Sequence, residues 1–446
     1  MTQHGEDALP NQPAEAPASP MTGSRVFIGV SVFLLLFLAG MAWYIHASRN
    51  ARSAWRQEAR AGVSASDAPN AIEPILDALD RVDWRAVSAS EALLKRTATE
   101  GWSEESAQLI PLIANHQQVL SLAMRSAAIP QCRLPPTSDA DASVPRPNIE
   151  EFRLLSFLLV ANGRRLAATG HAEEAAQRLM DAAILGVRFT RPRAEATLTS
   201  HLIGMTAMEL AIDALDDVIS TAGEMPAEWR GSLAAQLAEL DGSYYPIREA
   251  FRAEAGIYSR ELAARSATPA DLAEGLQLAG AVLPQGANTV EVAGSLHADA
   301  LTVTGEQDRV WGVLDGILAM PPARQPRIDR EWFAQASPNR LVQIQFAELT
   351  PLILREGILL ARLRLERAAL LPGGEALPAD PFDGEPLRVA EGRIWSIGPD
   401  LRDDGGMVEY APGKGLASGG DMIATRRASG QAPGLPHPAQ PASLRP

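Results

Sequence analysis

The chain has a single cysteine, Cys132, among 446 residues. One cysteine cannot close an internal disulfide or build a Cys-rich metal site, so both are excluded. Aromatic residues make up only 5% of the chain, whereas Ala and Leu are abundant. This composition favours helices packed through small residues over an all-β core. The net charge of −14 argues against a nucleic-acid-binding protein, because phosphates require a basic surface.

The common catalytic motifs are also missing. The seven histidines form neither an HExxH pair nor another local metal-ligand spacing. The chain has no GxSxG elbow, no Walker loop and no GxGxxG motif after a strand. His201 lies among apolar helical neighbours, which favours a packing or capping role over a catalytic one. We therefore expect no catalytic centre.

One long hydrophobic run is present near the N-terminus. Residues 26–45 read VFIGVSVFLLLFLAGMAWYI and carry no charge. About 20 apolar residues, each rising ~1.5 Å, span a hydrocarbon core about 30 Å thick. A signal peptide has a shorter apolar region of about 7–15 residues and a small-residue cleavage site, which this run lacks. The sequence therefore predicts an uncleaved transmembrane helix over residues 25–48.

Residues on either side of this run bear on its orientation. One arginine precedes the run, and four follow it closely: Arg49, Arg52, Arg56 and Arg60. Under the positive-inside rule this distribution places the C-terminal bulk of the chain in the cytoplasm.

The rest of the chain divides by composition. We predict a disordered tail over 1–24, a juxtamembrane linker over 49–70 and a helical domain over 71–372. A small β module over 376–427 and a second disordered tail over 428–446 follow.

Within the helical domain, apolar spacing and start and stop signals predict helices joined by Pro- and Gly-bearing turns. The predicted helical stretches are 71–79, 106–124, 149–188, 193–222, 227–240, 247–264, 269–282, 307–318 and 341–371. The predicted loops are 130–147 and 283–305.

Two of these stretches carry finer expectations. Residues 149–188 turn at Gly170 and resemble one tetratricopeptide-type helical hairpin. Since no second copy follows at a fixed interval, the sequence favours an irregular helical bundle or α-solenoid. In the last helix, we expect a solvated face made by Glu356, Arg362, Arg364, Glu366 and Arg367.

The C-terminal module carries the most specific pattern. Residues 380–384, DPFDG, predict a turn, since Pro fixes φ, Asp bonds its own backbone and Gly takes positive φ. Strands are expected over 387–389 and 392–397, followed by an acidic loop over 400–404. A third strand is expected over 421–425.

The ordered string DPFDG, WSIGPD, DDGG and GDMI, within residues 376–427, resembles the C-terminal β-sheet and calcium loop of the type II secretion pseudopilins. It is also similar to the same module at the end of bacterial envelope proteins with one membrane span and a helical ectodomain. The chain lacks the processing site and the Glu that a pilin needs near its mature end, so we do not expect it to polymerise as a pilin.

The resemblance implies a bound calcium ion and an extracytoplasmic compartment. Carried onto this chain, the candidate ligands are Asp403 or Asp404, Asp421, Asp400 and backbone carbonyls of 396–400. Calcium takes about 6–8 oxygen ligands, which such a loop can supply. The alternative is that these Asp residues only form a solvated turn. On orientation, we give the resemblance more weight than the arginines.

Together these observations predict a mainly α protein: a transmembrane helix, an irregular helical bundle or α-solenoid, and a small C-terminal antiparallel β module. The expected function is a single-pass scaffold of the bacterial inner membrane, with its bulk in the periplasm. Its helical body would bind another envelope protein, in secretion or envelope assembly. The alternative is a membrane-anchored enzyme with a site between helices, which buried, paired carboxylates in a deep cleft would favour.

Overall fold

The computed structural model of the chain describes residues 69–129, 149–190, 198–222, 225–264, 266–278, 289–346, 349–411, 416 and 418–425. The predicted tails, the predicted transmembrane helix, the loop over 130–147 and nearly all of the juxtamembrane linker lie outside these ranges. Among the described residues, no helix combines the length and the apolarity needed to cross a membrane.

The described chain is mainly α-helical and has a small antiparallel sheet near its C-terminal end, as predicted. The first elements are α2 (Ile72–Arg81), α3 (Trp84–Ala89), α4 (Glu91–Glu100), η1 (Glu105–Leu109), α5 (Ile110–Asn115) and α6 (Gln117–Ala127). The predicted helix over 106–124 is interrupted at His116, a buried residue. His116 Nδ1 lies 2.7 Å from the Leu112 carbonyl oxygen, and His116 Nε2 accepts the backbone N–H of Asp83. This histidine therefore has a structural role.

The predicted hairpin is present as α7 (Ile149–Ala168) and α8 (Ala172–Thr190). Gly170, at φ +84°, ends α7, and the N–H of His171 donates to the Leu166 carbonyl, an arrangement typical of a glycine C-cap. The next helix, α9 (Leu198–Thr221), packs closely on α8. A Cβ on Gly186 would lie 2.6 Å from the Gly204 carbonyl oxygen, so only glycine allows this approach.

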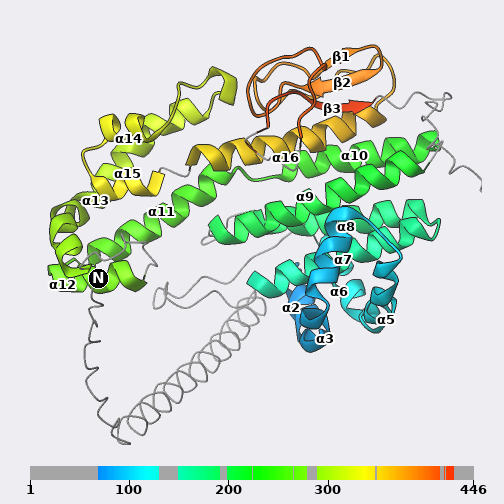
Figure 1. The fold of residues 1–446 in the computed structure, drawn as a ribbon, viewed down its shortest axis with the longest axis horizontal. Helices are drawn as coiled ribbons and strands as arrows, with labels where there is room; N and C mark the ends of the chain where they lie inside the picture. Colours follow the sequence, from blue (N-terminus) through cyan, green and yellow to red (C-terminus); the bar gives the residue numbers. More distant parts are fainter. Residues whose placement is uncertain are drawn as a thin grey trace, which may run out of the picture.

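The second half contains α10 (Ala227–Ser243), α11 (Ile247–Ala264), α12 (Pro269–Leu278), α13 (Thr289–Leu318), η2 (Pro322–Arg324), α14 (Arg330–Ala336), α15 (Arg340–Phe346) and α16 (Leu349–Leu370). Figure 1 shows α9, α10 and α16 in successive layers, with the sheet outside α16 and α2–α6 on the opposite side. Helices α11–α15 form the other end of the molecule.

The predicted loop over 283–305 is wrong from residue 289 onward, because α13 is helical there. Gly, Thr and Val lower the helix propensity of this stretch, but burial decides the outcome. Ala293, Leu296, Ala300 and Val303 recur at helical spacing and are buried in one cluster with residues of α11 and α12.

The predicted helix over 341–371 is two helices, α15 and α16. Pro351 provides the physical reason. In the interior of a continuous helix it would lack an N–H for the carbonyl of residue 347, and its ring would collide with that carbonyl. In the first turn of α16 neither problem arises, because the first N–H groups of a helix have no partner within it.

The predicted solvated face of the last helix is also wrong. Pairs join α16 to α9 and α10: Arg355 with Glu209 at 2.9 Å, Arg362 with Asp213 at 2.6 Å and Arg364 with Asp241 at 3.0 Å. Glu366 is buried, and none of the five residues assigned to that face is exposed. Helix α16 is covered on several sides, and these three arginines are paired across helices.

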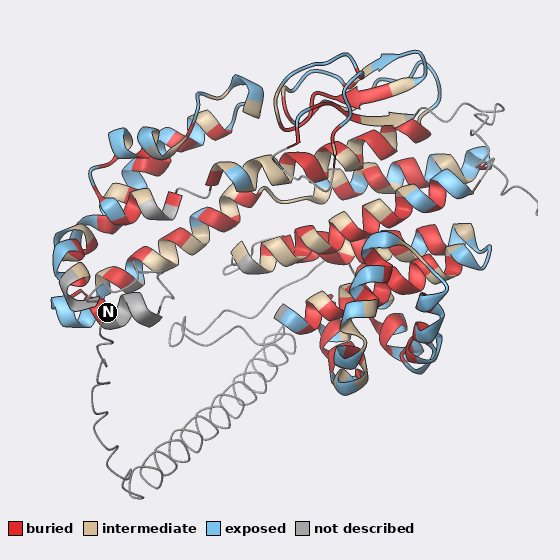
Figure 2. Cartoon of the chain, viewed as in Figure 1, coloured by how far each residue is buried: buried red, intermediate tan, exposed pale blue. Residues whose placement is uncertain are grey.

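The C-terminal strands are β1 (Arg388–Ala390), β2 (Arg393–Ser396) and β3 (Met422–Thr425), in the order β1-β2-β3. Both pairings are antiparallel, with Val389 opposite Ile394 and Trp395 opposite Ile423. Figure 2 shows buried residues where the sheet meets α16. There Phe382 is fully buried, and a Cβ on Gly357 of α16 would lie 2.6 Å from its ring. The DPFDG turn thus inserts a ring into a site that glycine leaves open.

Candidate functional site

The acidic loop of the C-terminal module folds back onto the sheet. Asp403 accepts the indole N–H of Trp395 at 3.0 Å and the backbone N–H of Gly405 at 2.9 Å. Its other oxygen lies 3.3 Å from Nε of Arg388. The indole hydrogen bond is the largest of the effects that lower the pKa of Asp403 below its usual value.

Asp421 lies fully buried just before β3. Its carboxylate accepts the N–H of Gly406 at 2.7 Å and that of Asp404 at 3.4 Å. Burial raises its pKa, and the charges of Asp403 and Asp404 raise it further. The structure therefore places the Asp421 carboxylate against the backbone of the turn at 403–406.

Asp400 belongs to the same loop but faces another backbone segment. Its carboxylate accepts the N–H of Gly420 at 2.8 Å and that of Arg402 at 3.2 Å. Asp404 is exposed, and its backbone N–H is what contacts Asp421.

These placements allow the fit of a calcium ion to be judged from the donors. Calcium is held by oxygen atoms, whereas the carboxylates of Asp400, Asp403 and Asp421 each receive at least two N–H groups. Within the described part of the chain, no three His, Cys, Asp or Glu side chains form a group that could hold a metal ion. This donor set does not fit calcium as arranged, and the calcium site stays a prediction.

Sequence reasoning did not single out Asp380 and Arg388 as a polar centre. Asp380 is fully buried and accepts four hydrogen bonds, from the N–H groups of Phe382 and Ile397, the Ser396 hydroxyl and Arg388. Arg388 also pairs with Asp383 and Asp403. Both residues were visible in or beside the DPFDG turn, but their convergence requires the strand pairing.

A groove of about 920 Å³ lies beside the turn of the α7–α8 hairpin, where the first turns of α8 and α10 face each other. Every charged residue among its described lining residues is acidic: Glu173, Glu174 and Glu228. These glutamates also lie in first helical turns, where a negative charge interacts favourably with the helix dipole and stabilises the helix. Half-buried Trp229 adds an aromatic wall.

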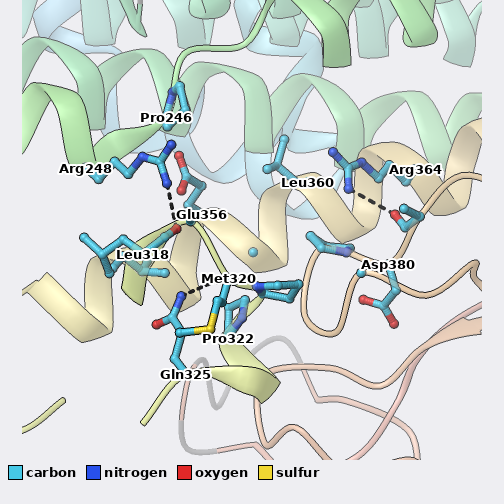
Figure 3. A pocket seen from close by; sticks show the side chains of 17 residues that line it. Pro246, Arg248, Leu318, Met320, Pro322, Gln325, Glu356, Leu360, Arg364 and Asp380 are labelled. Carbon is cyan, nitrogen blue, oxygen red and sulfur yellow. Dashed lines mark hydrogen bonds between the residues drawn. The ribbon is translucent and has the colours of Figure 1, made fainter. Parts of the chain in front are cut away.

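A second pocket, of about 310 Å³, lies between α16, the start of α11 and the DPFDG turn. In Figure 3 the carboxyl group of Glu356 lies beside Pro246 and Arg248. The N–H of Ile247 donates to Glu356 at 2.6 Å. Burial raises the pKa of Glu356 to about 7, so this carboxyl group can change charge near neutral pH.

From Glu356, polar contacts lead into the interior. Tyr244 and Glu356 interact electrostatically, and the Tyr244 hydroxyl lies 3.0 Å from His201 Nε2. His201 is fully buried, and its Nδ1 lies 3.2 Å from the Thr190 carbonyl oxygen. Burial lowers the pKa of His201 to about 4, so the ring is neutral and donates one hydrogen, from Nδ1 to that carbonyl.

Sequence reasoning missed Glu356, which it assigned to a solvated face. One signal was available, because Ile353 and Leu360 flank it at three and four residues and so mark an apolar helix face. Its partner Tyr244 lies on a distant part of the chain, and no spacing rule links the two.

Comparison of the chain with protein-family models, with curated proteins and with solved structures gives no match.

Proposed function

We propose that the chain is a scaffold protein of the bacterial inner membrane, anchored by the span predicted over 25–48, with its bulk in the periplasm. In this proposal, the groove beside the α7–α8 turn binds a segment of another envelope protein, in secretion or envelope assembly. The hydrophobic run and the C-terminal resemblance support the anchor and the compartment.

The groove is the observation that carries the binding role. Its charged lining residues are all acidic, and Trp229 offers a partly exposed ring. The complementary ligand is an extended segment with Lys or Arg side chains and one apolar side chain against the indole. Arg in particular pairs with carboxylates and stacks on aromatic rings.

Site-specific photo-crosslinking in the native cell tests this role. A photoreactive residue replaces Ser232, which lines the groove, and a second chain carries it at Leu301, an exposed position of α13. We expect one reproducible crosslink from position 232, to a basic segment of one envelope protein, and none to that segment from position 301.

Charge reversal then tests the specificity of the crosslink. Glu173→Lys with Glu228→Lys should reduce it by about tenfold, because like charges at the contact repel. Glu239→Lys, on an exposed part of α10 outside the groove, should leave it unchanged. A neutral or acidic crosslinked segment, or equal effects of the groove and control variants, would rule out the groove as the binding site.

One observation favours the alternative of a membrane-anchored enzyme. Glu356 is a half-buried residue that lines a pocket, and its pKa of about 7 suits general acid-base catalysis. Small-molecule binding that is lost in Glu356→Gln but kept in the groove variants would support that function instead.

A further inference from the structure

We infer that Arg388, which pairs with one of the predicted calcium ligands, Asp403, is the cation that holds the C-terminal module together. The inference concerns the module alone and does not rest on the groove of the helical body.

The first argument is the convergence of carboxylates on one guanidinium group. Nη1 of Arg388 lies 2.9 Å from Asp380, Nε lies 3.3 Å from Asp403, and Nη2 pairs with Asp383. These three residues come from the DPFDG turn and from the acidic loop, on either side of β1 and β2. A planar guanidinium has five N–H donors, so it can bridge several carboxylates at once, as a lysine ammonium cannot with the same geometry.

The second argument is burial. The side chain of Asp380 is 0% exposed and that of Arg388 is 22% exposed. Removing one partner of a buried pair leaves the other charge without compensation, which destabilises strongly. Arg388 therefore positions Asp380, which in turn holds the backbone N–H of Ile397 at the end of β2 and that of Phe382 in the turn.

The third argument is the state of the predicted calcium ligands. The buried Asp421 accepts N–H groups of the 403–406 turn, and Asp403 is held by Trp395 and Arg388. Side-chain and backbone N–H groups thus place positive charge against these carboxylates, as a bound metal ion would otherwise do.

The arrangement also ties the module to the helical body. Asp380 begins the turn that inserts Phe382 against Gly357 of α16, and the same turn lines the pocket that contains Glu356. Loss of Arg388 should therefore loosen both the sheet and its contact with α16.

Hydrogen–deuterium exchange of the purified full-length protein tests the inference, with chelator and with millimolar calcium. In the wild type, we expect the same protection of β2, β3 and the 380–397 segment in both conditions. In Arg388→Gln, exchange of these segments should rise by about tenfold or more, while α8 and α9 keep their protection, because local opening is governed by local contacts.

Arg402→Gln is the matched control, since it removes the same charge from an exposed position of the acidic loop. It should exchange as the wild type does. Arg388→Lys keeps the charge but loses the planar guanidinium group, so the same segments should also exchange faster in this variant. If the Arg388→Gln protein unfolds as a whole, Arg388→Lys becomes the deciding variant. Protection that collapses in chelator and returns with calcium would overturn the inference, as would equal exchange in the Arg388 and Arg402 variants.

Discussion

At the scale of single residues, the polar contacts that run from Glu356 through Tyr244 to His201 depend on which atoms carry protons. The Tyr244 hydroxyl carries one hydrogen, and the neutral His201 ring accepts it at Nε2 when Nδ1 donates to Thr190. A neutral Glu356 leaves that hydrogen to His201. An ionised Glu356 attracts the same hydrogen, because a carboxylate is a stronger acceptor than a neutral ring nitrogen.

This competition predicts how stability depends on pH. The folded pKa of Glu356 is raised from 4.5 to about 7, so its contribution is present below pH 4.5 and is lost as pH rises toward 7. The folded pKa of His201 is lowered from 6.5 to about 4, so its contribution is present above pH 6.5 and is lost as pH falls toward 4. The two slopes have opposite signs.

The substitution Glu356→Gln separates the contributions of Glu356 and His201 to the pH dependence of stability. The amide keeps an acceptor for the Ile247 N–H but cannot ionise, so it removes only the Glu356 slope. Compared with this variant, the free energy of unfolding of the wild type should fall by about 3 kcal/mol between about pH 4.5 and pH 7.5. This is the free energy that corresponds to the shift in the pKa of Glu356. Denaturant unfolding of both proteins across this range measures the difference, and parallel stability curves would contradict the assignment.

At the scale of elements, the crossing of α8 and α9 depends on two glycines facing each other. A Cβ on Gly186 would lie 2.6 Å from the Gly204 carbonyl oxygen and 2.7 Å from Met208 Cγ. Because these atoms belong to a buried interface, the helices must move apart to admit a methyl group. The sequence showed that small residues are abundant here, but not which of them touch.

Gly186→Ala should therefore destabilise the protein by about 1–3 kcal/mol from overpacking, reduced by up to about 1 kcal/mol from better helix propensity. Gly231→Ala is the control, because Gly231 lies in α10 with nothing within 4 Å of its Cβ position. The control should be neutral or stabilised by up to about 1 kcal/mol. Thermal unfolding of the two variants in the same detergent compares them, and equal midpoints would refute the close crossing.

At the scale of the whole molecule, α16 joins the three hydrophobic clusters of the described chain. Leu359 and Leu363 belong to the cluster with α2–α10, Leu349 to the cluster with α11–α15, and Ile358 and Leu365 to the cluster under the sheet. Because α16 is buried on several sides, its residues Arg355, Arg362 and Arg364 form ion pairs with neighbouring helices. The fold thus places the α7–α8 groove, the Glu356 pocket and the C-terminal module on one connected framework.

The orientation of this framework in the membrane is the remaining prediction at this scale. A C-terminal alkaline phosphatase fusion should be active, because the proposed periplasmic location allows that enzyme to form its disulfides. A cytoplasmic reporter fused at the same point should be inactive. The reverse pattern would show that the four arginines after the hydrophobic run, rather than the C-terminal resemblance, indicate the orientation.

The sequence by itself determined much of the local structure: the helical spacing, the glycine turn at Gly170 and the DPFDG turn. These features depend on hydrogen bonds and apolar faces within a few residues, so neighbouring side chains encode them. Thr268 and Asp271 show this at the start of α12, where each side chain accepts the other's backbone N–H, the reciprocal pattern of a capping box.

Only the tertiary structure decided which charges meet and which helices are buried. Arg355 and Glu209 are 146 residues apart, and Arg362 and Asp213 are 149 apart, so no local pattern links them. Burial made a helix of the Gly- and Thr-rich stretch at the start of α13, and it raised the pKa of Glu356. Strand pairing brought Arg388 to its three carboxylates. Desolvation and ion pairing depend on the surroundings in space, and these are set by contacts between distant segments.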